Sequence, residues 1–302
     1  MKSISFIRSC LITTLAAIAF GCAGCHPKDP TVRGANYWAG PTEPLENVVA
    51  RVNANNAAVT SLWSRHTFQA WLREADNKKE TYVDGDGELQ YRAEDEFRLA
   101  CKKAGVGELM TLGTNAETYW LTIKPEIDTM WWGRMENIGA PGTQSLPLDP
   151  TLVAQVLGVG RINSNLLQQP VPILRFNHDE GVYVITWNIR LPNQWASQRE
   201  IWYDRETFLP VRVYLYGEMG RVLLRADLSD HVPVKTQQGQ EVGGRVAGTY
   251  VLSFPDSGSR MILRLRDPLV SRNGFPKDLS FQLPLDKPGV AKVIRVDEAA
   301  GP

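Results

Sequence analysis

The chain has 302 residues, of which 43 % are hydrophobic, so it can bury a core, and disorder is excluded for most of its length. Its 33 Lys and Arg residues balance 33 Asp and Glu residues, which excludes a strongly basic nucleic-acid-binding protein. Nine Trp, nine Tyr and nine Phe residues outnumber four His and four Cys residues, a composition that favours binding through apolar contacts over catalysis.

The N-terminal residues have the organisation of an export signal. Two basic residues precede an apolar run at residues 10–20, which is shorter than the roughly 20 apolar residues that span a bilayer. The run ends in Ala19-Phe20-Gly21-Cys22, which resembles the lipobox of bacterial lipoproteins. We predict that residues 1–21 are a lipoprotein signal peptide and that Cys22 is acylated, with a fatty-acyl group such as palmitate. Cys25 is the second choice for the cleavage point.

The same residues allow a different interpretation. Cys22, Cys25 and His26 have the C-x-x-C-H spacing of covalent haem attachment, which would make the protein a small c-type electron carrier. Prolines at positions 27 and 30 disfavour the helix that usually presents this motif. We therefore favour acylation, and we interpret residues 22–44, which contain Pro, Gly and Asn, as a flexible tether.

Residues 45–302 are expected to form a single domain. Apolar residues at helical spacing predict an amphipathic helix from Leu45 to about Leu62 and a second helix from Leu148 to Val159. The other periodic segments are typical of strands; they are His66–Leu72, Glu80–Tyr91, Glu96–Lys102, Glu108–Gly113, Thr118–Ile123, Thr129–Met135, Ile173–Asn177, Val182–Arg190, Gln198–Asp204, Val211–Gly217, Arg221–Ser229, Gly248–Phe254 and Ser259–Arg266.

Short turn sequences between these segments indicate antiparallel hairpins. Asp84-Gly85-Asp86-Gly87 is one of the predicted turns. In Glu96–Lys102 and Arg260–Arg266, apolar and charged residues alternate, so each strand has one apolar face. The predicted fold class is mainly β with a few helices (α+β), built on a strongly curved antiparallel sheet of about a dozen strands. The helices either fill the apolar face as an ordinary core or leave a cavity on it.

Sequence motifs for chemistry are scarce. The metalloprotease, nucleophile-elbow, P-loop and dinucleotide-binding patterns are missing from the sequence. Asp84–Glu88 begins like a calcium loop, but Leu89 stands where such a loop requires Gly. His66, His178 and His231 lack metal-ligand spacing. We predict that the protein is not an enzyme and uses neither a metal nor another cofactor.

Several sequence patterns together resemble the LolA/LolB-type lipoprotein carrier and acceptor superfamily. They are the lipobox-like N-terminus, the opening amphipathic helix, residues 86–92 running into Phe97-Arg98-Leu99, Leu112-Gly113-Thr114-Asn115 before Tyr119-Trp120-Leu121, and residues 202–213. The resemblance covers roughly residues 45–268. It implies an incomplete antiparallel barrel lidded by helices, with an apolar cavity that receives the acyl chains of lipoproteins. Cys22 favours the membrane-anchored branch, similar to LolB.

We therefore predict an outer-membrane lipoprotein that faces the periplasm, is anchored through acylated Cys22, and binds lipid or lipoprotein acyl chains in lipoprotein sorting. A soluble periplasmic carrier protein is an expected partner, and nucleic acid is not. Strand alternation selects the candidate cavity-lining residues, which are Phe97, Leu99, Leu112, Trp120, Trp132, Val213, Leu263 and Leu265. The alternative is a structural or interaction lipoprotein of the envelope with a filled core and no ligand.

Overall fold

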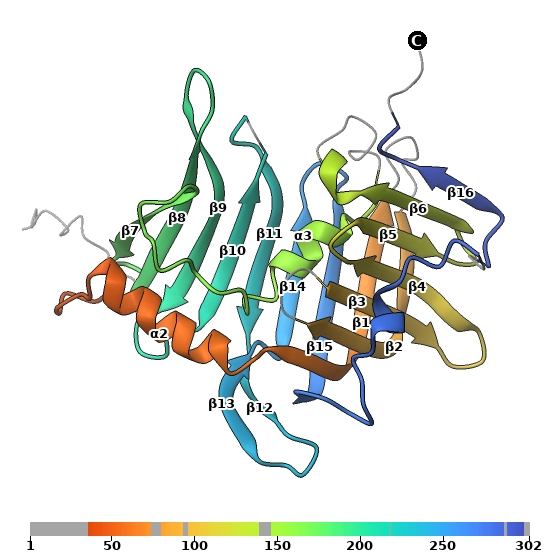
Figure 1. Ribbon diagram of the computed structural model, residues 1–302, viewed down its shortest axis with the longest axis horizontal. Coiled ribbons are helices and arrows are strands. Elements are labelled where there is room, and N and C mark those ends of the chain that lie inside the picture. The colour runs from red at the N-terminus through yellow and green to blue at the C-terminus, as the bar shows by residue number, and fades with distance from the viewer. Residues whose placement is uncertain are drawn as a thin grey trace, which may run out of the picture.

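A computed structural model describes residues 36–73, 80–92, 96–138, 146–217, 219–286 and 289–298. In these residues the chain forms one mostly antiparallel sheet of 16 strands and two α-helices (Figure 1). The prediction of a mainly β protein with a few helices is therefore confirmed. The predicted signal peptide, Cys22 and Cys25 lie outside the described residues, as does most of the predicted tether.

The first half of the sheet is a meander in which each strand pairs with the next one along the chain. Its strands are β1 (Ser61–Arg73), β2 (Glu80–Arg92), β3 (Glu96–Lys103), β4 (Gly107–Thr114), β5 (Thr118–Ile123) and β6 (Thr129–Arg134). The Asn115 side chain fixes the turn between β4 and β5 and so helps to set the register of these two strands. The Oδ1 atom of Asn115 accepts hydrogen bonds from the backbone N–H groups of Glu117 and Thr118 at 2.9 and 2.7 Å.

The second half of the sheet is another meander, and its last strand pairs with the first strand of the first meander. Its strands are β7 (Val171–Asn177), β8 (Val182–Arg190), β9 (Trp195–Asp204), β10 (Pro210–Tyr216), β11 (Val222–Ser229), β14 (Thr249–Phe254) and β15 (Ser259–Leu269). β15 pairs with both β14 and β1, which joins the two meanders into one sheet. The remaining described strands are β12 (Val232–Lys235), β13 (Glu241–Val246) and β16 (Lys292–Arg295).

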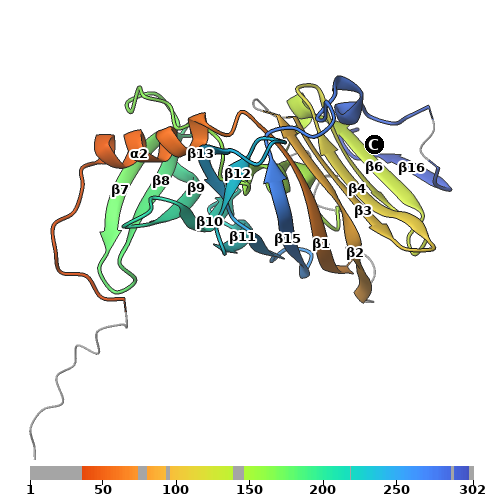
Figure 2. The ribbon, with the colours of Figure 1, turned by 90° about the horizontal axis from the view of Figure 1, so that it is seen from below.

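The sheet is open, which corrects the prediction of a strongly curved sheet. The edge strands β7 and β16 lie at opposite ends of the molecule in Figures 1 and 2, and the main path of the sheet runs from one to the other without closing. A sheet of this many strands curls, splits or flattens, and here the two meanders joined at β1 and β15 remain one open sheet. The sequence indicated the hairpins but not how many strands one sheet would contain.

Both predicted helices exist, but they are shorter than expected. α2 comprises Leu45–Ala57 and α3 comprises Pro150–Gln155. Val59 and Leu62 are buried, but Val59 follows the helix and Leu62 lies within β1, so their spacing continues the helical pattern for about one and a half turns beyond Ala57. α3 ends because Val156 and Leu157 enter a turn that Gly158 completes at a φ of 73°.

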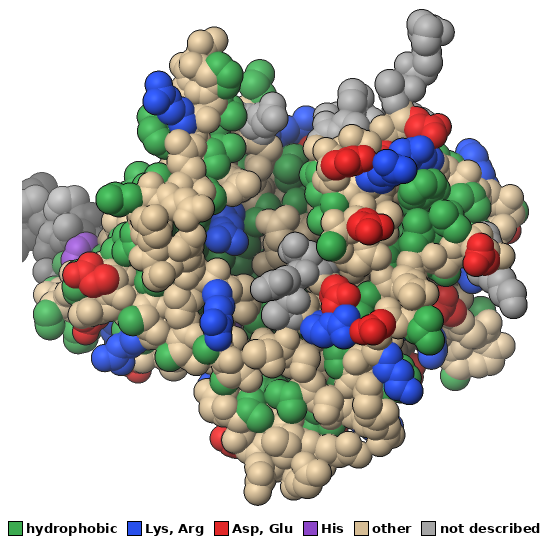
Figure 3. Space-filling view, viewed as in Figure 1, with side chains coloured by type: hydrophobic (Ala, Val, Ile, Leu, Met, Phe, Trp, Pro, Cys, Tyr) green, Lys and Arg blue, Asp and Glu red, His purple; other side chains and the backbone are tan. Residues whose placement is uncertain are grey.

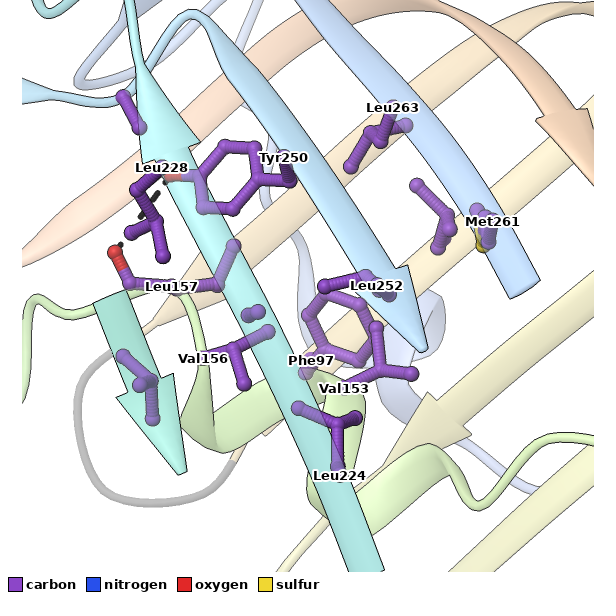
Figure 4. Close-up of a cluster of buried hydrophobic side chains, with 14 of the residues drawn as sticks. Phe97, Val153, Val156, Leu157, Leu224, Leu228, Tyr250, Leu252, Met261 and Leu263 are labelled. Carbon is purple, nitrogen blue, oxygen red and sulfur yellow. Dashed lines mark hydrogen bonds between the residues drawn. The ribbon is translucent and has the colours of Figure 1, made fainter. Parts of the chain in front are cut away.

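The hydrophobic core lies between the helices and one face of the sheet, which we call the helix face. Figure 2 shows α2 lying along this side of the sheet. Figure 4 shows Val153 of α3 beside Phe97 of β3, with side chains of β11, β14 and β15 around them. This burial of aliphatic and aromatic side chains is the main stabilising contribution.

The predicted turn at residues 84–87 is wrong, because these residues lie inside β2. Gly85 pairs with Phe68 of β1, and Gly87 pairs with His66. A Cβ atom at either glycine would collide with a backbone carbonyl of β3, that of Lys102 or of Ala100. The glycines are therefore required by the close approach of β3 and not by a turn.

Replacement of Gly87 by Ala tests this close approach. We expect Gly87→Ala to lower the free energy of unfolding by about 2–4 kcal/mol, because the new methyl group would displace β3. Gly160→Ala is the matched control, since no heavy atom lies within 4 Å of the position its Cβ would take. Urea denaturation of both variants measures the effect, and equal stabilities would contradict the interpretation.

His66 gives the fold a pH dependence. Its side chain is 1 % exposed, and burial lowers its pKa from 6.5 to about 4. Between these two pH values the unfolded chain binds a proton that the folded chain does not, so the free energy of unfolding falls as the pH falls. We expect this residue to contribute a loss of about 3 kcal/mol between pH 7 and pH 4. Urea denaturation of wild type and His66→Phe at both pH values checks this, and a pH-independent difference would contradict it.

Candidate functional site

A cavity of about 640 Å³ lies on the helix face, beneath α3 and the segment that follows it. Its floor comes from both halves of the sheet, with Phe97 and Thr114 on one side and Trp187, Ile201 and Tyr203 on the other. Figure 3 looks onto this face, which is hollowed between the β8–β9 side and the β4–β6 side of the molecule. The volume falls within the range of about 300–1,000 Å³ that is typical of small-molecule sites.

Asparagines of α2 hold one wall of the cavity in place. The side chain of Asn53 donates to the carbonyl of Ile162 and accepts from its N–H, both at 2.8 Å. The buried side chain of Asn56 donates to the carbonyl of Gly160 at 2.7 Å. These bonds satisfy the backbone of residues 158–162 where that segment crosses the sheet without secondary structure.

α3 is fixed above the cavity by its cap and its apolar face. The carboxylate of Asp149 accepts hydrogen bonds from the N–H and the hydroxyl of Thr151, at 2.8 and 2.7 Å. At the other end of the helix, the Tyr250 hydroxyl donates to the carbonyl of Leu157 at 3.5 Å, the dashed line in Figure 4. Ala154 and Gln155 of this helix line the cavity.

The charge around the cavity has one sign. Among the described lining residues, the charged ones are Arg161 and Arg199, and there is no Asp or Glu. Arg161 is exposed, whereas Arg199 projects from β9 and lies over the Trp187 ring at 4.3 Å. Burial lowers the pKa of Arg199, although a guanidinium stays charged in proteins. The Arg199 Nε atom is buried and has no hydrogen-bond partner among the described residues.

The structure places six of the eight predicted lining residues on the helix face. Phe97 lines the cavity itself. The other five are buried in the core on that face; they are Leu99, Leu112, Val213, Leu263 and Leu265. They lie on four strands, β3, β4, β10 and β15, so alternation places them on one face of the sheet but does not locate the cavity along it.

Trp120 and Trp132 lie on the opposite face of the sheet, which corrects their assignment to the cavity side. They pair with each other across β5 and β6, and Trp120 pairs with Gly113 of β4. The ring of Trp120 occupies the space above Gly113 and is buried there. The burial of both faces of β5 explains the error, because alternation then no longer distinguishes the two faces.

The sequence analysis missed Arg199, which carries the half-buried charge of the cavity. A signal for it was present: in β9, Arg199 occupies the same face as Ile201 and Tyr203, so a charged residue stands at an apolar-face position. The wall at residues 158–162 had no such signal, because its place depends on hydrogen bonds to α2.

A second, smaller cavity of about 340 Å³ lies where residues 38–43 pass over α2 and the β8–β9 side of the sheet. Its walls include Trp38, with the Arg205 guanidinium 4.7 Å from the Trp38 ring. Trp38 also donates its backbone N–H to the carbonyl of His178 at 2.9 Å. The described part of the predicted tether therefore packs on the domain edge.

The described residues contain neither a metal-binding cluster nor a membrane-spanning helix. The described part of the chain contains no group of three or more His, Cys, Asp or Glu side chains arranged to hold a metal ion. None of its helices has the length and apolar character needed to cross a bilayer. Cys101 is buried in the core, and burial raises the pKa of its thiol well above the ordinary value.

Comparison with protein-family models and with curated proteins finds no match. A DUF1329 family protein from Desulfovibrio piger is similar in structure, with a TM-score of 0.50 and 11 % identity over 80 % of this chain and 98 % of its own. A LolA superfamily protein from Nitrosomonas europaea has a TM-score of 0.47 at 11 % identity, covering 79 % and 97 % of the two chains. A Vibrio parahaemolyticus domain named for outer membrane lipoprotein sorting has a TM-score of 0.45 at 12 % identity, covering 78 % and 95 %. At these identities, the likeness to the Desulfovibrio piger protein shows a shared fold and no more.

Proposed function

We propose that this protein is an envelope lipoprotein that binds an apolar chain, such as the acyl chain of a lipid or a lipoprotein, in the cavity on the helix face. The observation that carries the proposal is the cavity itself, about 640 Å³ in volume and lined in large part by apolar and aromatic side chains. Each methylene group buried there contributes about 0.8 kcal/mol, so a long chain binds without any catalytic group. The proposed role is binding and not catalysis.

The walls of the cavity support this role. Ala154 belongs to a helix of six residues, and the following wall is an irregular segment held through Asn53 and Asn56. A short helix and an irregular segment leave part of the apolar floor uncovered, whereas long helices packed across the sheet would fill it. A bound apolar chain completes the burial of side chains such as Phe97 and Ile201.

Filling the cavity from α3 tests the proposal. We expect Ala154→Trp to weaken binding of methyl cis-parinarate, an uncharged fluorescent acyl probe, by about tenfold or more, because the indole occupies the space of the chain. Fluorescence titration measures the affinity of the mature chain without Cys22, from residue 23 onward, after removal of bound lipid; this protein is called the delipidated mature chain below.

Val251→Trp is the matched control, because Val251 lies on the opposite face of the sheet and is 38 % exposed. This variant should bind the probe as the wild type does. Absence of saturable binding to the wild-type chain would reject the proposed function and favour a structural or interaction lipoprotein. Equal affinity in wild type and Ala154→Trp would place the bound chain elsewhere.

The anchoring part of the proposal depends on Cys22. We propose that Cys22 is acylated, that the protein is held at the outer membrane facing the periplasm, and that a soluble carrier delivers its ligand. The lipobox-like residues Ala19-Phe20-Gly21-Cys22 after the apolar run support the acylation. A short tether before the folded domain agrees with this arrangement.

Substitution of the acylated cysteine tests the anchor. We expect the intact mass of the wild-type protein to match a chain that begins at Cys22 and carries fatty-acyl groups, and Cys22→Ser to lose them. The Cys25→Ser variant is the control and should keep the acyl groups. A mass that includes haem, or acylation that survives Cys22→Ser and disappears in Cys25→Ser, would overturn the assignment of Cys22.

A further inference from the structure

The cavity contains an arginine whose environment a purely apolar ligand does not explain. The Arg199 side chain is half-buried, and its Nε atom is buried without a hydrogen-bond partner among the described residues. A buried cation is costly unless an anion or hydrogen-bond acceptors compensate for the lost water. Stacking on Trp187 at 4.3 Å compensates for part of that loss but does not use the N–H groups.

The protein supplies no anion to Arg199 in the described residues. The guanidinium forms no ion pair with the described residues, and the described lining of the cavity contains no carboxylate. The next residue, Glu200, lies on the opposite face of the sheet, where it binds Thr186 and Trp202. The Asp149 carboxylate near α3 is bound to Thr151 and is not part of the lining.

We propose that the ligand of the cavity is an anionic amphiphile, an apolar chain that ends in a carboxylate or phosphate group, and that Arg199 binds its acid group. The proposal rests on the proposed function, since it names the class of ligand for the same cavity. The planar guanidinium offers donors in a geometry that matches both acids. Ile201 and Phe97 line the same cavity and contact the chain.

Arg161 is the arginine of the same cavity with which Arg199 can be compared. It lines the same cavity, but its side chain is exposed to water, which screens its charge. The two arginines therefore carry the same charge at one cavity but differ in burial. If desolvation makes the acid contact strong, only the replacement of Arg199 changes the affinity greatly.

The experiment compares an acid with its uncharged ester. Cis-parinaric acid and methyl cis-parinarate are titrated at pH 8 into the delipidated mature chain and into the variants Arg199→Met, Arg199→Lys and Arg161→Met. We expect the wild type to prefer the acid by about tenfold or more. Arg199→Met should lose this preference, because its affinity for the acid falls while its affinity for the ester stays the same. Arg199→Lys should keep part of the preference. Arg161→Met should change its affinity for either probe by less than about threefold.

Competition experiments identify the source of the acid group. Hexadecanoate and hexadecyl phosphate should displace cis-parinaric acid from the wild type, hexadecanol should displace it at higher concentration, and inorganic phosphate should not displace it. If inorganic phosphate displaced cis-parinaric acid at the same concentration as hexadecyl phosphate, the site would bind a free anion. This result would overturn the proposal of an amphiphilic ligand. Equal wild-type affinity for acid and ester would overturn the role of Arg199 and leave the proposed function intact.

Folding of the variant is checked independently. Because Arg199 is half-buried and forms no ion pair with the described residues, we expect Arg199→Met to be at least as stable to urea as the wild type in the absence of ligand. Loss of acid binding together with retained ester binding then reports on recognition and not on unfolding. Loss of both probes in a stable variant would show that Arg199 shapes the cavity, and would contradict its role in binding the acid.

Discussion

The pairing of β1 with β15 is the contact on which the rest of the structure depends. It joins residues 61–73 to residues 259–269 in one antiparallel ladder and so turns two separate meanders into a single sheet. The floor of the cavity needs this junction, because Phe97 comes from the first meander while Ile201 and Arg199 come from the second. A change that separated β1 from β15 would divide the cavity as well as the sheet.

A wide sheet with few helices explains why there is a cavity. The apolar helix face extends over both meanders, but the described residues cover it with two short α-helices, α2 and α3, the 3-10 helix Met135–Asn137 and irregular segments. α2 covers one end, and its asparagines hold residues 158–162 over the centre. We propose that the half-buried cation at Arg199 adds specificity to this apolar space, since a charge placed there favours an acid group.

The local pattern of the sequence predicted the strands well and the ends of the helices poorly. The alternation of apolar and polar side chains within a strand depends on the strand's own residues, so it does not depend on which strands it pairs with. The first helix was extended to Leu62 because Val59 and Leu62 continue the helical spacing from within a turn and a strand. Trp120 was placed on the cavity side because β5 is buried on both faces, which removes the contrast between apolar and polar positions.

Periodicity and short motifs depend on neighbouring residues, and they predict a mainly β domain built of hairpins, a lipobox-like N-terminus and an apolar strand face. The folded structure shows that the sheet is open, that residues 84–87 lie within a strand, and where the cavity lies. It also brought Arg199 and Phe97 to one cavity. These features depend on which distant strands pair and on how closely they approach, and no local pattern records either.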